Sequence, residues 1–151
     1  MNQPLRLLIV DDSADDVELL LHSLRSQGYP VVSAAVDTPM SMRAALERQE
    51  WELITCDHSM QGFNATAALA IAKELRPDVP FIIVSGEIDL NLAVSLIKAG
   101  ARDCVHKSEL IRLGAVIERE LRDAELSRQR KLTEDRLREN QELFRAIVEN
   151  V

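Results

Sequence analysis

Aromatic residues make up only 3% of this 151-residue chain, so the core that it folds around must be aliphatic. The scarcity argues against stacking platforms for single-stranded nucleic acid, which depend on aromatic rings. Cysteine is also scarce: Cys56 and Cys104 form neither a Cys-x-x-Cys motif nor a disulfide framework, which favours a reducing, cytoplasmic location. No apolar run approaches the roughly 18 residues of a membrane span. The run at residues 5–10 is too short for a signal peptide.

Basic residues are outnumbered, 18 against 25, and the net charge of −7 argues against direct binding to nucleic acid or to an acidic membrane surface. The charge is uneven: residues 1–117 hold 16 acidic and 10 basic residues, and residues 118–151 hold 9 and 8. Half of the second segment is charged, and it has neither glycine nor proline. This pattern predicts a compact acidic body followed by a long mixed-charge helix.

Short apolar runs alternate with helical stretches in the body. Gly28 and Gly100 fall where two of the helices should end, because glycine readily takes the left-handed conformation found there. Five strands that alternate with helices indicate an α/β fold with a parallel sheet covered on both faces. We predict strands at residues 5–10, 31–35, 53–56, 81–84 and 104–106, and helices at 14–27, 39–49, 65–75 and 89–99.

The final segment carries a period of eleven residues rather than seven. Such a repeat averages about 3.67 residues per turn and favours a straight or slightly right-handed helical bundle. One interpretation is a solvated last helix with a flexible linker; the other, which we favour, is a helix that pairs in a homodimer, as in a coiled coil. The two rows are Leu110, Leu121, Leu132 and Leu143, and Ala115, Leu126, Leu137 and Val148.

Polar side chains follow four of the five predicted strands. Asp11 and Asp12 follow the first, Asp57 the third, Ser85 the fourth and Lys107 the fifth. Ligands of open parallel sheets bind beyond the carboxyl ends of the strands, so these side chains are expected to converge. The second strand ends without a polar residue, as expected for an edge strand. Singly, each of these residues has an ordinary role as a helix cap, a turn residue or a solvated side chain.

Three carboxylates close together need a compensating charge. At about 5 Å and an effective dielectric near 20, each pair repels by roughly 3 kcal/mol. A hard divalent cation offsets this repulsion, and Mg²⁺ suits one or two carboxylates together with waters and a phosphate. Two of the carboxylates can then hold the metal while one acts as a nucleophile toward phosphorus. The hydroxyl of Ser85 and the ammonium of Lys107 can receive phosphoryl oxygens.

The segments around these residues resemble the response-regulator receiver domain of two-component signalling. The resemblance covers about residues 4–125 and implies a flavodoxin-like (βα)5 doubly wound sheet with strand order 2-1-3-4-5, with a long C-terminal helix extending from the fifth helix. The matching segments are Leu-Ile-Val-Asp-Asp-Ser at residues 8–13, Asp-His-Ser-Met-Gln-Gly-Phe at 57–63, Phe-Ile-Ile-Val-Ser-Gly at 81–86 and Ala-Gly-Ala-Arg-Asp-Cys-Val-His-Lys at 99–107.

The resemblance also implies a role for each residue of the cluster. Asp57 is the expected phosphoacceptor, which takes a phosphoryl group from the phosphohistidine of a sensor histidine kinase or a phosphotransfer protein. Asp11, Asp12, Asp57 and the backbone carbonyl of Ser59 are the expected Mg²⁺ ligands, Asp11 through a water. Ser85 is the expected switch hydroxyl, and Lys107 the salt-bridge partner of the phosphoryl group. The resemblance implies self-dephosphorylation at most for the receiver itself, and an enzymatic output domain in a full-length protein stays open.

Some positions depart from the family pattern. Cys104 stands where the family usually has an aromatic residue, so the usual coupling of that ring to the switch hydroxyl is not implied here. Ser108 replaces a frequent proline after the lysine, which predicts a trans peptide bond. Gln61 replaces the proline of a common Met-Pro-Gly after the acceptor. Ser59 and Glu87 occupy positions that tune the lifetime of the phosphoryl group.

The last fifteen residues, 137–151, resemble the helix that leads into a PAS sensory domain. We therefore expect a receiver at residues 1–125 and a signalling-helix linker at 126–151, in a longer protein with a PAS-like domain. The output of such proteins is commonly cyclic-di-GMP turnover or a histidine kinase, and these residues do not choose between them.

Two other functions remain open at this point. A pseudo-receiver keeps the fold and acts as a dimerisation or interaction scaffold without phosphotransfer; the missing aromatic favours it and the complete set of polar residues argues against it. A small Mg²⁺-dependent phosphohydrolase with an aspartyl nucleophile needs Asp-x-Asp after the first strand, and this chain has Asp11-Asp12-Ser13 instead.

Overall fold

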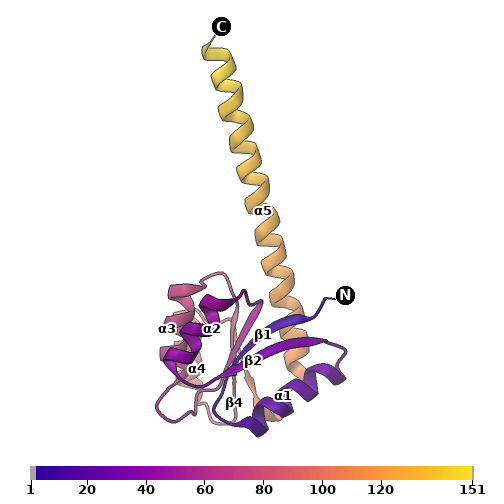
Figure 1. Cartoon of the computed structure of the whole chain (residues 1–151), viewed down its shortest axis with the longest axis vertical. Helices are drawn as coiled ribbons and strands as arrows, with labels where there is room; N and C mark the ends of the chain where they lie inside the picture. Colours follow the sequence, from indigo (N-terminus) through magenta and orange to yellow (C-terminus); the bar gives the residue numbers. More distant parts are fainter. Residues whose placement is uncertain (1–2, 151) are drawn as a thin grey trace. The chain divides into compact units, whose positions relative to one another are not determined.

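The computed structural model describes residues 3–150 and shows the predicted alternation of strands and helices (Figure 1). The first half of the chain contains β1 (Leu5–Val10), α1 (Ala14–Ser26), β2 (Val31–Val36), α2 (Pro39–Arg48) and β3 (Leu53–Cys56). The second half contains α3 (Ala65–Leu75), β4 (Phe81–Ser85), α4 (Leu90–Ala99), β5 (Asp103–His106), the 3₁₀ turn η1 (Lys107–Glu109) and α5 (Ile111–Glu149).

The five strands form one parallel sheet in the order β2-β1-β3-β4-β5, as the resemblance implied. The register sets Val10 and Cys56, the last residues of β1 and β3, side by side. Cys56 also pairs with Ile83, two residues before the end of β4. Every residue of β3 and β4 is buried, as expected for central strands of a sheet covered on both faces. The strand ends that carry the polar residues therefore lie along one edge.

Helices cover both faces of the sheet, and Figure 1 shows α2, α3 and α4 on one side and α1 on the other. Successive side chains of a strand point to opposite faces of the sheet. Leu8 and Val10 therefore pack into the larger aliphatic cluster, whereas Leu7 and Ile9 face the other side. The beginning of α5 joins α1 on that second face, where the Tyr29 hydroxyl donates to the Gly114 carbonyl at 3.2 Å.

Local capping explains where the helices begin and end. Ser13 caps α1 by accepting a hydrogen bond from the Asp16 amide at 3.3 Å. Gly28 and Gly100 follow α1 and α4 with positive φ of 94° and 125°, as predicted from the sequence. The element bounds differ from the predicted ones by a residue at several ends. Of these only Ser85 matters for the site, since it is the last residue of β4 rather than the first residue after it.

The chain divides into two units, a compact one that ends at Glu118 and a second from Arg119 onward. The second unit contains the remainder of α5. Most large apolar side chains of its described residues are exposed, including Leu126, Leu132, Leu137 and Leu143. The continuous helix predicted after the body is thus present. Within residues 3–150 no helix has both the length and the apolar character that crossing a bilayer requires.

Candidate functional site

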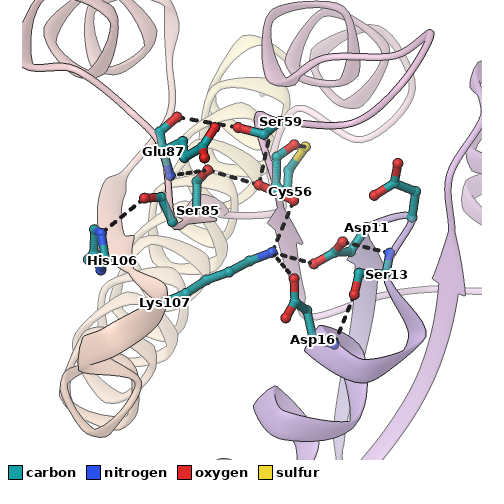
Figure 2. A network of polar contacts seen from close by, with 12 residues as sticks. Asp11, Ser13, Asp16, Cys56, Ser59, Ser85, Glu87, His106 and Lys107 are labelled. Atoms are coloured by element: carbon teal, nitrogen blue, oxygen red, sulfur yellow. Dashed lines mark hydrogen bonds and ion pairs between the residues drawn. The ribbon is translucent and has the colours of Figure 1, made fainter.

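The polar residues predicted at the strand ends do converge, and Figure 2 shows the network that they form. Asp11 and Asp12 follow β1, Asp57 follows β3, Ser85 closes β4 and Lys107 opens the 3₁₀ turn after β5. Backbone hydrogen bonds fix two of these positions, since the amides of Asp11 and Asp57 donate to carbonyls of neighbouring strands, at Val36 and Val10. The site is therefore built on the sheet itself.

Asp57 lies at the centre of the network and is buried. Its Oδ1 accepts from the Ser85 hydroxyl at 2.8 Å and from the Ser59 amide at 3.2 Å, while its Oδ2 faces the Lys107 ammonium at 3.0 Å. Burial raises the pKa of Asp57, but the hydrogen bonds from Lys107, Ser85 and Ser59 outweigh it, so the pKa lies below the ordinary carboxyl value. Asp57 is therefore an ionised carboxylate at neutral pH.

Lys107 contacts three carboxylates. Its Nζ lies 2.6 Å from Oδ2 of Asp16, 3.0 Å from Oδ2 of Asp57 and 3.1 Å from Oδ2 of Asp11. Burial lowers the pKa of Lys107, but the hydrogen bonds to Asp16, Asp57 and Asp11 more than offset this and raise the pKa well above its ordinary value. The ammonium is therefore charged at neutral pH.

Asp11, Asp12 and Asp57 each offer a carboxylate oxygen, and these oxygens lie within 4.8 Å of one another. Backbone amides hold two of the carboxylates, since Ser13 donates to Asp11 at 3.0 Å and Gln61 donates to Asp12 at 3.2 Å. Burial is the main reason that the pKa of Asp11 is raised, against the opposing hydrogen bonds from Ser13 and Lys107. A set of hard oxygen donors with one exposed member, Asp12, fits a hydrated cation such as Mg²⁺.

The Ser85 hydroxyl is also connected to the loop that follows β4. The Glu87 amide donates to Ser85 Oγ at 3.3 Å, and the Ser59 hydroxyl donates to the Glu87 carbonyl at 3.4 Å. His106, which pairs with Ser85 in the sheet register, places its Nε2 3.1 Å from the Gly86 carbonyl. The two positions predicted to tune the phosphoryl lifetime, Ser59 and Glu87, thus contact each other beside the switch hydroxyl.

Asp16 belongs to this network although it follows no strand, so the sequence pattern did not predict it. It lies in the first turn of α1, four residues after Asp12, and reaches Lys107 from the helix rather than from a strand end. A usable sign was present, because four of the six residues from 11 to 16 are aspartates. The Ser59 carbonyl stays a predicted metal ligand, since the described contacts of Ser59 involve its amide and its hydroxyl.

Two departures from the family pattern can be placed. Cys104 lies in β5, is partly buried and packs against the main aliphatic cluster; burial raises the pKa of its thiol. The peptide bonds of the described residues are all trans, so the predicted trans bond between Lys107 and Ser108 is confirmed.

A parallel sheet of this order, with three carboxylates, a hydroxyl and an ammonium at its carboxyl edge, has the architecture of a phosphorelay receiver. The chain matches the family described as the response regulator receiver domain over residues 7–118, and it belongs to that family. A receiver domain implies a kinase partner.

Three known proteins place the chain among its relatives. A protein-glutamate methylesterase/protein-glutamine glutaminase 2 of Paramagnetospirillum magneticum is 33% identical over 110 residues, which cover 71% of this chain and 31% of the relative. The transcriptional regulatory protein ZraR of Escherichia coli is 34% identical over 104 residues, 67% of this chain and 22% of the relative. The crystal structure of the receiver domain of NtrX from Brucella abortus is 30% identical with a TM-score of 0.69, covering 77% of this chain and 98% of that one. The chain thus spans under a third of either curated relative.

Proposed function

We propose that the chain is a Mg²⁺-dependent phosphoacceptor, in which Asp57 takes a phosphoryl group from the phosphohistidine of a sensor histidine kinase or a phosphotransfer protein. The observation that carries the proposal is the state of Asp57: a buried, ionised carboxylate held by Ser85 and Ser59 and facing Lys107. An ionised carboxylate needs no general base, because it is already the nucleophile.

In the proposed reaction a carboxylate oxygen of Asp57 bonds to phosphorus as the bond from phosphorus to the imidazole nitrogen breaks. The bonding electron pair stays on that nitrogen. Because the other ring nitrogen of the phosphohistidine carries a proton, the leaving group is a neutral imidazole. Lys107 and the Ser85 hydroxyl are placed to donate to the phosphoryl oxygens, where negative charge is concentrated. Asp11, Asp12, Asp57 and the Ser59 carbonyl would hold Mg²⁺, which would neutralise part of the phosphoryl charge.

Switching is proposed to follow from the charge that the phosphoryl group brings next to Asp11 and Asp12. Ser85 then exchanges its carboxylate partner for a phosphoryl oxygen. The same hydroxyl accepts from the Glu87 amide, so the loop that leads into α4 is drawn along. The names of the two curated relatives describe an esterase and a transcriptional regulator. Similarity to these relatives therefore does not indicate which output activity this switch controls.

The test is to incubate the purified protein with a small acyl phosphate, with and without Mg²⁺, and to measure its intact mass. We expect the mass of one added phosphoryl group, only when Mg²⁺ is present. Absence of any adduct under both conditions would contradict the proposal and favour the pseudo-receiver scaffold, the second candidate, which Cys104 at the usual aromatic position supports. Steady turnover of a free phosphomonoester would instead indicate a phosphohydrolase.

Mg²⁺ is expected to stabilise the fold, because it relieves the repulsion among Asp11, Asp12 and Asp57. At about 100 times its dissociation constant a ligand of the native state adds about 2.7 kcal/mol, which raises Tm by several degrees in a domain of this size. Thermal unfolding with and without Mg²⁺ measures the shift. Asp12→Asn should remove most of it without disturbing the core, since Asp12 is exposed, and the matched variant Asp15→Asn should keep it. An undiminished shift in Asp12→Asn would place the cation elsewhere.

We further propose that the receiver extends over residues 1–125 and that residues 126–151 form a cytoplasmic signalling helix that pairs in a homodimer and leads into a PAS-like domain. The exposed leucines of α5 support the pairing, and the free thiols of Cys56 and Cys104 agree with a reducing compartment. The coding sequence beyond Val151 tests the last part: a stop codon there would contradict it.

A further inference from the structure

The Lys107 ammonium has more anionic partners than a simple acceptor–lysine pair requires. Figure 2 shows its side chain reaching between Asp11 and Asp16, with dashed contacts to both. The shortest contact is with Asp16, at 2.6 Å, against 3.0 Å to Asp57 and 3.1 Å to Asp11. Asp16 is also the most exposed of the three carboxylates, at 35% of its side-chain surface against 6% for Asp57 and 7% for Asp11. It can therefore be altered without opening the core.

The Lys107 ammonium has few N–H groups left for a further anion. A lysine ammonium has three N–H groups. In this structure hydrogen bonds to Asp16 and Asp57 take two of them, and Oδ2 of Asp11 lies 3.1 Å from the same nitrogen. A phosphoryl oxygen arriving on Asp57 must therefore draw an N–H group away from one of these partners or share it. Asp16 lies in α1, whereas Asp57 follows β3. The ion pair between Asp16 and Lys107 is therefore expected to persist when Asp57 is modified.

Helix capping does not account for the orientation of Asp16. The Ser13 hydroxyl already accepts from the Asp16 amide, and an acidic side chain in the first turn is also provided by its exposed neighbour Asp15. What distinguishes Asp16 from Asp15 among their described contacts is the ion pair with Lys107. The two residues thus offer a matched pair with the same charge and the same helix turn.

We propose that Asp16 is a positioning residue that holds Lys107 in the unmodified receiver and competes with an anionic group on Asp57 for the same ammonium. The proposal rests on the phosphoacceptor function and adds a determinant of how tightly the anion is held. Removing the charge of Asp16 should therefore strengthen anion binding at Asp57. If Asp16 instead supported anion binding, the same change would weaken it.

The test is the affinity for beryllofluoride, a phosphoryl mimic, at saturating Mg²⁺ by isothermal titration calorimetry. Asp16→Asn is expected to tighten binding by about three- to fivefold, the upper part of the effect of one partly exposed ion pair. Asp15→Asn should change it less than about twofold, as expected for a solvated charge. Asp16→Glu, which restores the charge, should return the affinity toward that of the unaltered protein.

A double-mutant cycle separates competition through Lys107 from a general effect of charge. In a Lys107→Ala background, titrated at concentrations high enough to saturate its weaker site, Asp16→Asn should no longer tighten binding. Unchanged or weaker binding in Asp16→Asn alone, an equal gain in Asp15→Asn, or the full gain without Lys107 would overturn the proposal. If the unaltered protein binds no beryllofluoride, the phosphoacceptor function itself fails; if it binds but Asp16→Asn has no effect, only the role of Asp16 fails.

Discussion

Asp57→Asn is expected to abolish the phosphoryl adduct completely. The amide has the size and shape of the carboxylate, so the packing around this buried position is retained, but its oxygen is no longer an anionic nucleophile. Lys107 keeps Asp11 and Asp16 as partners, so the substitution leaves no buried charge unpaired. Intact mass after incubation with an acyl phosphate and Mg²⁺ measures the loss, and thermal unfolding confirms that the variant is folded.

Asp78→Asn is the matched control for Asp57→Asn. Asp78 is exposed in the connection before β4, so the same chemical change there should leave the full adduct. An adduct of equal yield in Asp57→Asn would mean that another side chain accepts the phosphoryl group, and peptide mapping would then locate it. The Asp78→Asn control gives the adduct yield of a folded protein with an unaltered site, and the yield of Asp57→Asn is compared with it.

The position of the site was predictable because it follows from the parallel sheet alone. In a parallel sheet covered by helices, the carboxyl ends of all strands meet at one edge, so residues far apart in the chain need no contact information to be grouped. Asp11, Asp57 and Lys107 were grouped in this way, and the structure brings them within hydrogen-bond distance. The strand order does not follow in the same way, because the alternation of strands and helices does not determine it. Only the resemblance to receiver domains implies it.

Asp16 could not be assigned by the same rule. It lies on a helix, where its approach to Lys107 depends on how α1 is rotated against the sheet, and that rotation is set by the packing of buried residues such as Leu20 and Leu24. Asp15 and Asp16 are the same residue type and both lie in the first turn of α1, so the sequence alone does not distinguish them. The contact of the Gly86 carbonyl with His106 was likewise missed, because it depends on the exact register of β4 with β5.

Substitution of Leu132 by glutamate is expected to convert the proposed homodimer into a monomer. Leu126, Leu132, Leu137 and Leu143 are 55%, 60%, 59% and 62% exposed, although they recur at a regular spacing that an unpaired solvated helix does not need. Pairing would bury the leucines of the row that faces the partner helix, for about 1.5–3 kcal/mol each. A carboxylate at Leu132 would instead be buried without a partner in each chain, which costs more than the leucine contributed. Sedimentation velocity at several protein concentrations measures the change.

Ser127→Glu supplies the control, because Ser127 is exposed on the side of the helix turned away from both leucine rows, so the same carboxylate there stays in water. It should sediment like the unaltered protein, and the chain without residues 126–151 should be a monomer, as Leu132→Glu should be. If the unaltered protein is already a monomer at all concentrations, the helix does not pair by itself. The leucine rows would then have to be covered within a longer protein. A dimer that survives both Leu132→Glu and the truncation would place the interface on the receiver instead.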